Sequence, residues 1–371
     1  MVTYPSDWRM VPAEQIVDIG TGCRDTQDNV PYGKYPFFVR SSVVERIDVA
    51  DYDCEAVLTA GDGVGTGKVF HYIKGQFAAH QRVYVMNNFR DITGRYFYYQ
   101  FSRNFINEVE KYTAKSSVDS VRRAMIAKME IPLPSINEQI AIVNALEGFD
   151  THIANLVELI EKKKAIRDGA LEDLVSGRVR LDGHSCSWKQ VELGSIASYR
   201  KERDVQPRRL YISTENMNQM FSGIIPYEGN EPTGGTAFFP GDTLIANIRP
   251  YLKKIWCAEF VGTCSADVLV LAGNDRIVPK FLYYSLANDR FISYVMTGGV
   301  KGIKMPRGDK KYIMKYPLLI PSDIHEQKII SEMISAMDNE IMALEDERDK
   351  MIQIREGAMD DLLTGRVRLV V

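Results

Sequence analysis

Two long segments of the chain carry apolar residues at the seven-residue spacing of a coiled-coil helix. In the first segment the seam residues are Leu146, Ile153 and Ile160 at position a and Ile142, Phe149 and Leu156 at position d. In the second they are Ile334, Ile341 and Arg348 at a and Ile330, Met337, Leu344 and Met351 at d, so one arginine interrupts the seam. The pattern predicts two helices of about 40 residues, each roughly 60 Å long, that pair with each other. The alternative is that both helices are buried in one globular core.

The rest of the chain has the alternation and turn residues of strands. Short apolar runs bounded by Gly, Asp and Asn predict strands at Val69–Ile73, Gln81–Met86, Thr243–Asn247 and Asp267–Leu271. Helices are expected at Tyr96–Tyr112 and Lys280–Met296. We therefore expect a compact α+β domain before each long helix.

The two helical segments are copies of one sequence element. Ile136–Leu181 aligns without a gap to Ile324–Leu369, 188 residues later, and 19 of the 46 aligned pairs are identical. A weaker sequence similarity precedes each copy, because Trp8 and Val11 correspond to Trp188 and Val191. Such duplication favours a pseudo-two-fold internal repeat. The predicted organisation is a globular domain (1–133), a helical spacer (134–181), a second globular domain (182–319) and a second spacer (320–371), with the two long helices antiparallel.

Composition limits the class of protein. The chain has 371 residues and a net charge of −3, and its apolar runs are far shorter than the ~20 residues of a membrane span. The N-terminus lacks the pattern of a signal segment. The five cysteines and five histidines are scattered without the spacing of metal ligands. We expect a soluble, cytoplasmic protein without a membrane partner and with no metal site.

Charge is unevenly distributed along the chain. Residues 188–318 carry a net charge of +6 and residues 1–130 are neutral, whereas the segments 131–187 and 319–371 carry −3 and −6. Because DNA phosphates attract Lys and Arg, and amides and guanidinium groups read base edges, polar loops of the domains are the candidate DNA contacts. In the first domain these are Lys68, His71, Lys74, Arg82, Lys115 and Arg122. In the second they are Arg200, Lys201, Arg203, Asn216, Asn218, Asn247, Arg249, Lys253, Lys254, Lys301, Lys304 and Arg307.

The sequence contains no complete motif of a known enzyme class. The stretch Gly61–Val69 resembles a phosphate-binding loop, but Asp62 stands where that loop needs glycine and Val69 where it needs Ser or Thr. A turn between strands is therefore expected there. The chain has no Pro-Pro of a base-methylating loop, no nucleophile elbow and no His-Glu-x-x-His motif. We expect a protein without catalytic residues.

The layout resembles the specificity (S) subunit of type I restriction–modification systems. The resemblance rests on Trp-x-x-Val at the opening of each domain, on Pro-Ser and Glu-Gln at the opening of each helix, and on the shared ending from Arg167 or Arg355 through Gly-Arg-Val-Arg-Leu. Phe239–Ala246 and the following Asn247-Ile-Arg-Pro also resemble the target-recognition domains of that family. The resemblance implies a non-catalytic subunit in which each domain reads one half of a bipartite double-stranded DNA target, while the helices set the spacing.

The resemblance also implies partners. The helices would dock modification subunits, expected to number two, and two restriction subunits would join them. S-adenosylmethionine, ATP and Mg²⁺ are then expected on those partners and no cofactor on this chain. The repeated polar residues of the helical segments are the candidate partner contacts: Glu138, Gln139, Arg167, Asp173, Glu326, Gln327, Arg355 and Asp361. Two alternatives remain open: a coiled-coil adaptor that clamps partners without reading sequence, and an enzyme with an unrecognised site.

Overall fold

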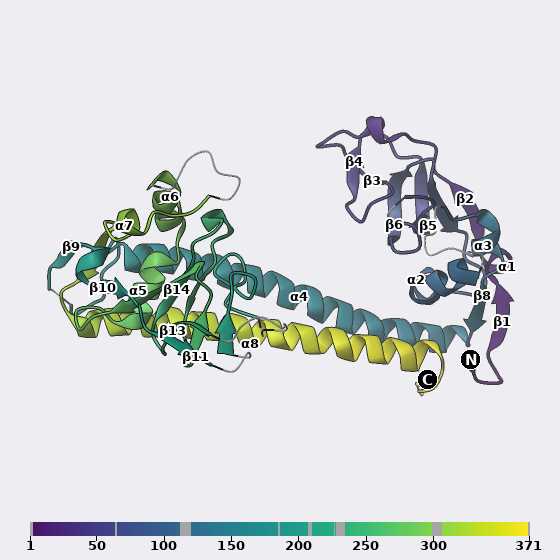
Figure 1. Ribbon diagram of the computed structural model, residues 1–371. Coiled ribbons are helices and arrows are strands. Elements are labelled where there is room, and N and C mark those ends of the chain that lie inside the picture. Colours follow the sequence, from purple (N-terminus) through teal and green to yellow (C-terminus); the bar gives the residue numbers. More distant parts are fainter. Residues whose placement is uncertain are drawn as a thin grey trace. The chain divides into compact units, whose positions relative to one another are not determined.

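The computed structural model describes residues 3–63, 65–111, 120–184, 186–206, 210–225, 227, 234–298 and 306–369 (Figure 1). The chain packs as two compact units. Unit 1 comprises Met1–Val157 with Asp346–Val371, and unit 2 comprises Glu158–Glu345. Each unit therefore contains one globular domain and half of each long helix. The predicted segment boundaries at residues 133, 181 and 319 remain a prediction.

Unit 1 is built on a six-stranded sheet with the order β2-β7-β5-β6-β3-β4. Its neighbours are antiparallel except for the parallel pair β3 and β6. The strands are β2 (Asp18–Thr21), β3 (Tyr35–Phe38), β4 (Glu45–Ile47), β5 (Tyr52–Ala60), β6 (Phe70–Ala79) and β7 (Val83–Asn87). A separate ladder joins β1 (Arg9–Pro12) to β8 (Glu130–Leu133). The helical elements are α1 (Ala13–Ile16), η1 (Thr26–Asp28), α2 (Gly94–Lys111) and α3 (Arg123–Ala127).

The core of unit 1 lies where helix α2 contacts strands β5 and β6. Phe97, Phe101 and Phe105 recur at helical spacing on one face of α2, are fully buried, and stack on one another with ring centroids 5.5 and 4.4 Å apart. Phe70 of β6 meets Phe101 edge to face at 5.6 Å. This aromatic row fixes the helix on the sheet, since each buried ring removes a large apolar area from water.

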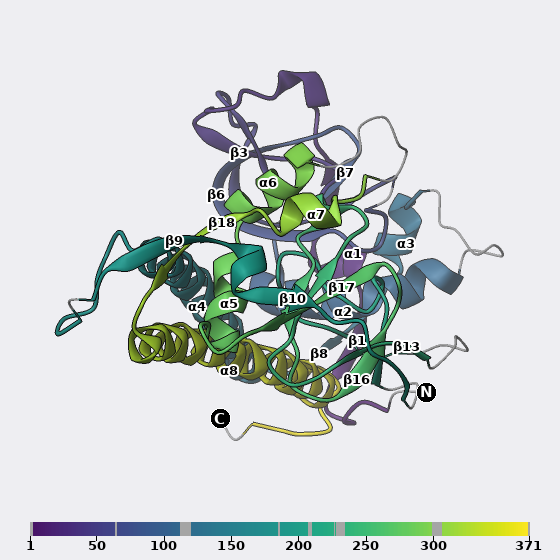
Figure 2. The ribbon, with the colours of Figure 1, turned by 60° about the vertical axis from the view of Figure 1, so that its left-hand side comes forward.

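Unit 2 contains two four-stranded sheets, with the orders β10-β17-β14-β15 and β11-β13-β16-β12 (Figure 2). The strands are β10 (Ala197–Tyr199), β11 (Arg203–Val205), β12 (Tyr211–Ile212), β13 (Gly234–Phe238), β14 (Thr243–Ala246), β15 (Ile255–Cys257), β16 (Gly262–Cys264) and β17 (Val268–Gly273). A ladder also joins β9 (Trp188–Glu192) to β18 (Pro317–Pro321). The helical elements are η2 (Leu193–Ser195), η4 (Pro250–Leu252), α5 (Pro279–Leu286), α6 (Asp289–Gly298) and α7 (Lys310–Ile313).

The same topology occurs in both units. The order β2-β7-β5-β6 in unit 1 corresponds strand by strand to β10-β17-β14-β15 in unit 2, and all these neighbours are antiparallel. The β1–β8 ladder likewise corresponds to the β9–β18 ladder. The prediction of an α+β fold with two repeated domains is therefore confirmed.

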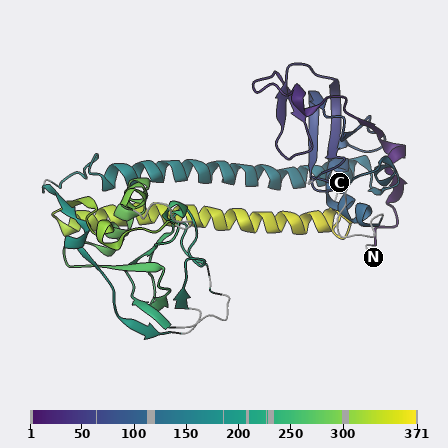
Figure 3. The same ribbon diagram turned by 45° about the horizontal axis from the view of Figure 1, so that its top comes forward.

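The two long helices are α4 (Ile136–Val175) and α8 (Ile324–Leu363), continuous over their whole lengths (Figures 1 and 3). Gly177 and Gly365 follow them at φ values of 69° and 71°, the left-handed conformation that ends a helix and that glycine adopts without strain. Along both helices the predicted seam residues are buried or half-buried, including Arg348. Both helices were predicted, with their ends.

Ion pairs fix the direction of the helices within each unit. In unit 1, Asp150 and His152 of α4 pair with Arg355 and Glu347 of α8. In unit 2, Lys163 pairs with Glu340 and Arg167 with Asp338. In each unit, a higher residue number on α4 pairs with a lower residue number on α8. The two helices therefore run antiparallel.

One predicted helix is interrupted. The segment predicted as a helix at Lys280–Met296 is two helices, α5 and α6, with a break at Ala287 and Asn288. Asn288 makes this break, because its amide donates to the Ser285 carbonyl at 2.8 Å while its Oδ1 accepts from the Phe291 N–H at 3.0 Å. Asparagine thus ends one helix and begins the next. In the described part of the chain, no helix is long and apolar enough to cross a membrane.

Candidate nucleic-acid interface

The connection between strands β14 and β15 carries the largest group of predicted DNA contacts. This loop, residues 247–254, contains Asn247, Arg249, Lys253 and Lys254 and includes the short helix η4. Strand pairing on both sides holds its ends, since β14 and β15 are antiparallel neighbours within the sheet. The loop therefore projects from a rigid frame.

The three cations of this loop differ in what they contact. Arg249 is exposed, and among the described residues its side chain has no hydrogen-bond or ion-pair partner. Lys253 forms an ion pair with Asp289 at 2.6 Å. Lys254 donates to the Thr214 carbonyl at 2.7 Å, and its burial lowers the pKa of the ammonium group. Arg249 is thus the cation of this loop that is free to meet a ligand.

Several other predicted contacts of unit 2 are held within the fold. Arg200 makes a bidentate ion pair with the buried Asp242, at 2.7 and 3.0 Å, and lies over the Phe239 ring. Asn216 is buried and accepts from the Ser213 N–H at 2.9 Å and its hydroxyl at 2.7 Å. Arg200 and Asn216 thus have intramolecular partners, and their role in DNA contact remains a prediction. Arg200 satisfies the buried Asp242 carboxylate, and the buried Asn216 is itself satisfied by Ser213.

The remaining predicted contacts of unit 2 lie nearer the surface. Asn218 donates to the Ser222 carbonyl at 3.1 Å, and Arg307 pairs with Asp267 at 3.1 Å. The Asn247 Oδ1 is buried without a hydrogen-bond partner among the described residues. Lys201 and Arg203 are exposed. Lys301 and Lys304 lie outside the residues that the structure describes.

In unit 1 the predicted contacts divide in the same way. Lys68, Lys74 and Arg122 are exposed, on the β5–β6 connection, on β6 and before α3 respectively. Arg82 pairs with Asp62, which also pairs with Arg40 at 3.0 Å. Lys115 lies in residues 112–119, outside the described part of the chain.

His71, another predicted DNA contact, packs against neighbouring residues of its own domain. Its Nε2 lies 3.2 Å from the Ser41 carbonyl oxygen, and its ring packs on Phe38 with centroids 5.0 Å apart. Burial lowers the pKa of this imidazole, so the ring is neutral at pH 7 and offers no charge to a phosphate.

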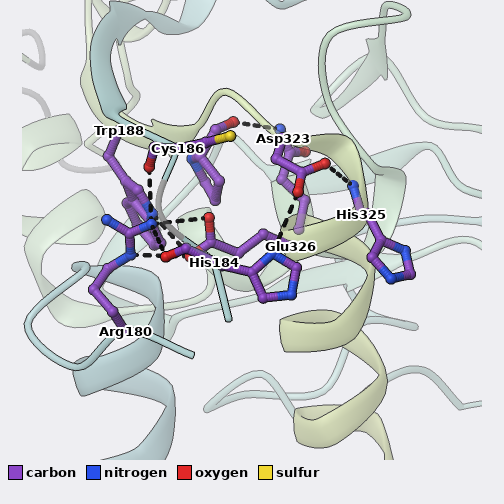
Figure 4. A network of polar contacts seen from close by, with 9 residues as sticks. Arg180, His184, Cys186, Trp188, Asp323, His325 and Glu326 are labelled. Atoms are coloured by element: carbon purple, nitrogen blue, oxygen red, sulfur yellow. Dashed lines mark hydrogen bonds and ion pairs between the residues drawn. The ribbon is translucent and has the colours of Figure 1, made fainter. Parts of the chain in front are cut away.

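The repeated polar residues of the helical segments form two equivalent junctions. In unit 2 the carboxylate of Glu326 is fully buried and accepts from the Arg180 guanidinium at 3.0 and 3.1 Å and from Trp188 Nε1 at 3.1 Å (Figure 4). Arg180 also donates to the carbonyls of His184 and Cys186. This junction ties the end of α4 to the start of α8 and to strand β9.

Unit 1 contains the same junction made from the two ends of the chain. The buried Glu138 of α4 pairs with Arg368, which also donates to both carboxylate oxygens of Asp7 at 3.1 and 3.0 Å. The Arg368 guanidinium lies over the Trp8 ring, as the Arg180 guanidinium lies over Trp188. Each carboxylate is therefore paired with an arginine from the other copy of the helical repeat.

The glutamines that follow these carboxylates bind the domain to its helix. Gln139 accepts from the Thr93 N–H at 2.9 Å and donates to the carbonyls of Asp91 and Pro134. Gln327 accepts from the Val278 N–H at 2.8 Å and donates to the carbonyls of Arg276 and Pro321. Both amides are fully buried and use three hydrogen bonds each.

The other candidate partner contacts also have intramolecular partners. Arg167 pairs with Asp338 at 3.0 Å and Arg355 with Asp150 at 2.5 Å, and these two pairs are equivalent in the repeat. Asp173 and Asp361 pair with Arg178 and Arg366, just beyond the helix ends. The contact that the structure records for each repeated polar residue is thus internal, and a role in partner binding remains a prediction.

Sequence reasoning missed Arg180 and Arg368, which neutralise the two buried carboxylates. Their repetition could have indicated them, because each is the second arginine of the Gly-Arg-Val-Arg-Leu that ends each copy. Among the described residues, no group of three or more His, Cys, Asp or Glu side chains could hold a metal ion.

Comparison with known proteins gives the family. The model of the type I restriction modification DNA specificity domain matches residues 5–165 and again residues 187–353. The EcoDI specificity subunit of the Escherichia coli type I restriction enzyme is 24% identical over 364 residues, covering 88% of this chain and 80% of that protein. The MjaVIII specificity subunit of Methanocaldococcus jannaschii is 22% identical over 417 residues, covering 98% and 94%.

Solved structures share the fold. The S subunit of a type I restriction–modification system from M. genitalium superposes with a TM-score of 0.66 at 19% identity, over 96% of each chain. A chain from a structure of the type I restriction–modification system gives a TM-score of 0.56 at 14% identity, over 98% of this chain and 100% of that one. Because the family model matches both halves and most of the sequence, this chain belongs to the type I restriction modification DNA specificity domain family.

Proposed function

We propose that this chain is the non-catalytic, DNA-reading subunit of a type I restriction–modification complex, with one half of a bipartite target read by each domain. The observation that carries the proposal is that the DNA specificity domain model matches the chain twice, once in each half. The duplicated sheet topology supports it, since two similar frames can present different loops. Exposed cations on these frames, such as Lys68 and Arg249, supply the charge that DNA binding needs.

The helices are the proposed docking surface for the modification subunits. Exposed large apolar side chains lie on them: Ile136, Ile140 and Ile354 in unit 1, and Leu159, Ile166, Ile324, Met333 and Met342 in unit 2. Ile136 and Ile324 are equivalent in the repeat, as are Ile166 and Ile354. Exposed apolar groups of this kind favour protein partners, and their repetition supports two equivalent docking sites and hence two modification subunits.

The remaining partners and the chemistry follow from this assignment. We propose that S-adenosylmethionine, ATP and Mg²⁺ act in partner subunits, including two restriction subunits, and that this chain supplies recognition in the cytoplasm. The antiparallel α4 and α8, with their buried heptad seam, are proposed to pair as a coiled coil that sets the gap between the half-sites.

Methylome sequencing tests the proposal. A host without its own DNA methylation would express this chain together with the modification subunit encoded beside it. A bipartite methylated motif that disappears when this chain is omitted is the expected result. An assembled complex that methylates no defined motif would contradict sequence reading and support the alternative of a clamp-like adaptor.

A further inference from the structure

Two loops that share only their final lysine, Lys68 and Lys254, occupy the same place in the two domains. Residues 61–68 connect β5 to β6, and residues 247–254 connect β14 to β15. In the equivalent sheets β2-β7-β5-β6 and β10-β17-β14-β15, these are the connections between the third and fourth strands.

The backbones of the two loops also agree. Gly63 and Gly67 have φ values of 80° and 66°, and Arg249 and Lys253 have φ values of 52° and 56°, with three residues between the two positions in each loop. Between them, the Thr66 N–H donates to the Gly63 carbonyl at 3.1 Å, as the Leu252 N–H donates to the Arg249 carbonyl at 2.9 Å. In the described residues of each loop, a backbone hydrogen bond therefore closes a turn at one left-handed residue, and a second left-handed residue follows it.

Each turn is linked to a distant segment in the same way. An isolated β-bridge joins Asp62 to Ser120, and another joins Ile248 to Arg307. The Gly61 carbonyl accepts from the Val121 N–H at 2.7 Å, and the Asn247 carbonyl accepts from the Gly308 N–H at 3.4 Å. We call residues 61–68 and 247–254 the bridged turns of the two domains.

The second bridged turn carries strain that the first avoids. Glycine adopts positive φ without cost, whereas Arg249 and Lys253 have a Cβ that clashes with the backbone in this conformation. A neighbouring loop holds the strained turn in place, because the Met220 N–H donates to the Leu252 carbonyl at 3.1 Å and the Phe221 N–H to the Lys253 carbonyl at 2.8 Å. Met220 and Phe221 themselves have φ values of 55° and 61°. Backbone strain maintained by surrounding contacts is typical of functional positions.

The left-handed backbone sets the direction in which the Arg249 side chain leaves the turn. Lys253 is engaged with Asp289, so the arginine is the cation of the turn that projects outward without a partner in the described chain. A phosphate contact needs only a nearby charge, which a flexible side chain on unstrained backbone provides. Reading a base edge requires the guanidinium to reach the base from a defined direction, which a fixed Cα–Cβ bond favours, and its commonest form is the bidentate contact of arginine with guanine.

We propose that the bridged turn of unit 2 reads a base, and that Arg249 contacts a guanine within the half-site of that domain. This inference rests on the proposed function of the chain. Gly63 occupies the corresponding position in unit 1 and has no side chain, so the first domain reads its half-site without an equivalent contact.

The test exploits the strain. Arg249→Gly removes the side chain and relieves the left-handed backbone, and Met220→Gly is the matched control, because it relieves the same kind of strain at an exposed position of the adjoining loop without removing a charge. Both variants are purified as the complex with the modification subunit. DNA binding is then measured by competition with the target motif and with single-base variants of it.

Both substitutions are expected to raise the thermal midpoint, by about 2–4 °C each. Arg249→Gly is expected to weaken binding to the target by about 10- to 100-fold and to abolish the preference for one guanine in one half-site. Met220→Gly is expected to leave affinity within about two-fold, since the cation is retained. Arg249→Asn, which tolerates the left-handed conformation, provides a second folded variant without the guanidinium.

Three results would overturn the inference: unchanged binding by the Arg249 variants, an equal loss for every DNA sequence, and an equal loss in Met220→Gly. The second result indicates a phosphate contact and the third a disturbed loop. Failure of the proposed function itself is distinguishable, because the wild-type complex would then show no target motif at all.

Discussion

Each buried carboxylate of the helical repeat depends on an arginine that is distant in sequence. Glu326 is paired with Arg180 and Glu138 with Arg368, and both carboxylates are almost completely inaccessible to water. A buried charge without a partner costs several kcal/mol. These pairs therefore stabilise the junction between each domain and its helices in a way that an exposed ion pair cannot.

Removing one arginine of these pairs tests this assignment. Arg180→Ala leaves the fully buried Glu326 with the Trp188 N–H as its remaining side-chain donor, and we expect the free energy of unfolding of unit 2 to fall by about 2–3 kcal/mol. Arg178→Ala is the control, because its pairs with Glu172 and Asp173 are exposed, and we expect a loss below about 1 kcal/mol. Denaturant unfolding measures both values. Equal losses in the two variants would show that burial of Glu326 does not govern the stability of the junction.

The sequence located these residues but did not indicate the direction in which they face. Repetition in both copies marked Glu138 and Glu326 as important, and we expected them to contact partner proteins. A single sequence does not show whether a charged residue on a helix is buried, and the arginine that neutralises Glu326 is 146 residues away. The left-handed conformation of Arg249 was equally inaccessible, because positive φ is predicted from glycine and asparagine rather than from arginine.

At the scale of elements, the long helices were the most predictable part of the fold. Their heptad pattern, the preceding prolines and the final glycines define α4 and α8 nearly to the residue. Four strands of the sheets were also found, because alternation and flanking turn residues mark β6, β7, β14 and β17, whereas the others, including the long β5, were not predicted. The break between α5 and α6 was missed, since it depends on one asparagine bonding to both helices.

If the helices set the gap between half-sites, their length is a measurable variable. Inserting seven residues after Val157 in α4 and seven after Glu345 in α8 keeps the heptad register and lengthens both helices by about 10 Å. We expect the methylated motif to keep both half-sites while its gap grows by about three base pairs, at 3.4 Å per pair. An assembled complex that retains the original gap would exclude the helices as the spacer.

At the scale of the whole molecule, the repeat is closed by contacts between the chain ends. In unit 2 a continuous segment runs from the end of α4 through Arg180 to Trp188. In unit 1 the corresponding place is occupied by Arg368, which contacts Asp7 and Trp8. Both domains thus join their helices through the same junction, and on this ground we expect that one domain can be exchanged for the other.

Interchangeability gives the most direct test of the central claim that each domain reads one half-site. Residues 8–134 are inserted in place of residues 188–321, so that the chain carries the first domain twice between unchanged helices. The methylome of a methylation-free host that expresses this chain with its modification subunit is then sequenced. We predict a palindromic motif in which the first half-site occurs twice in inverted orientation. A motif that still contains the second half-site, or an assembled complex that methylates no defined motif, would contradict the account.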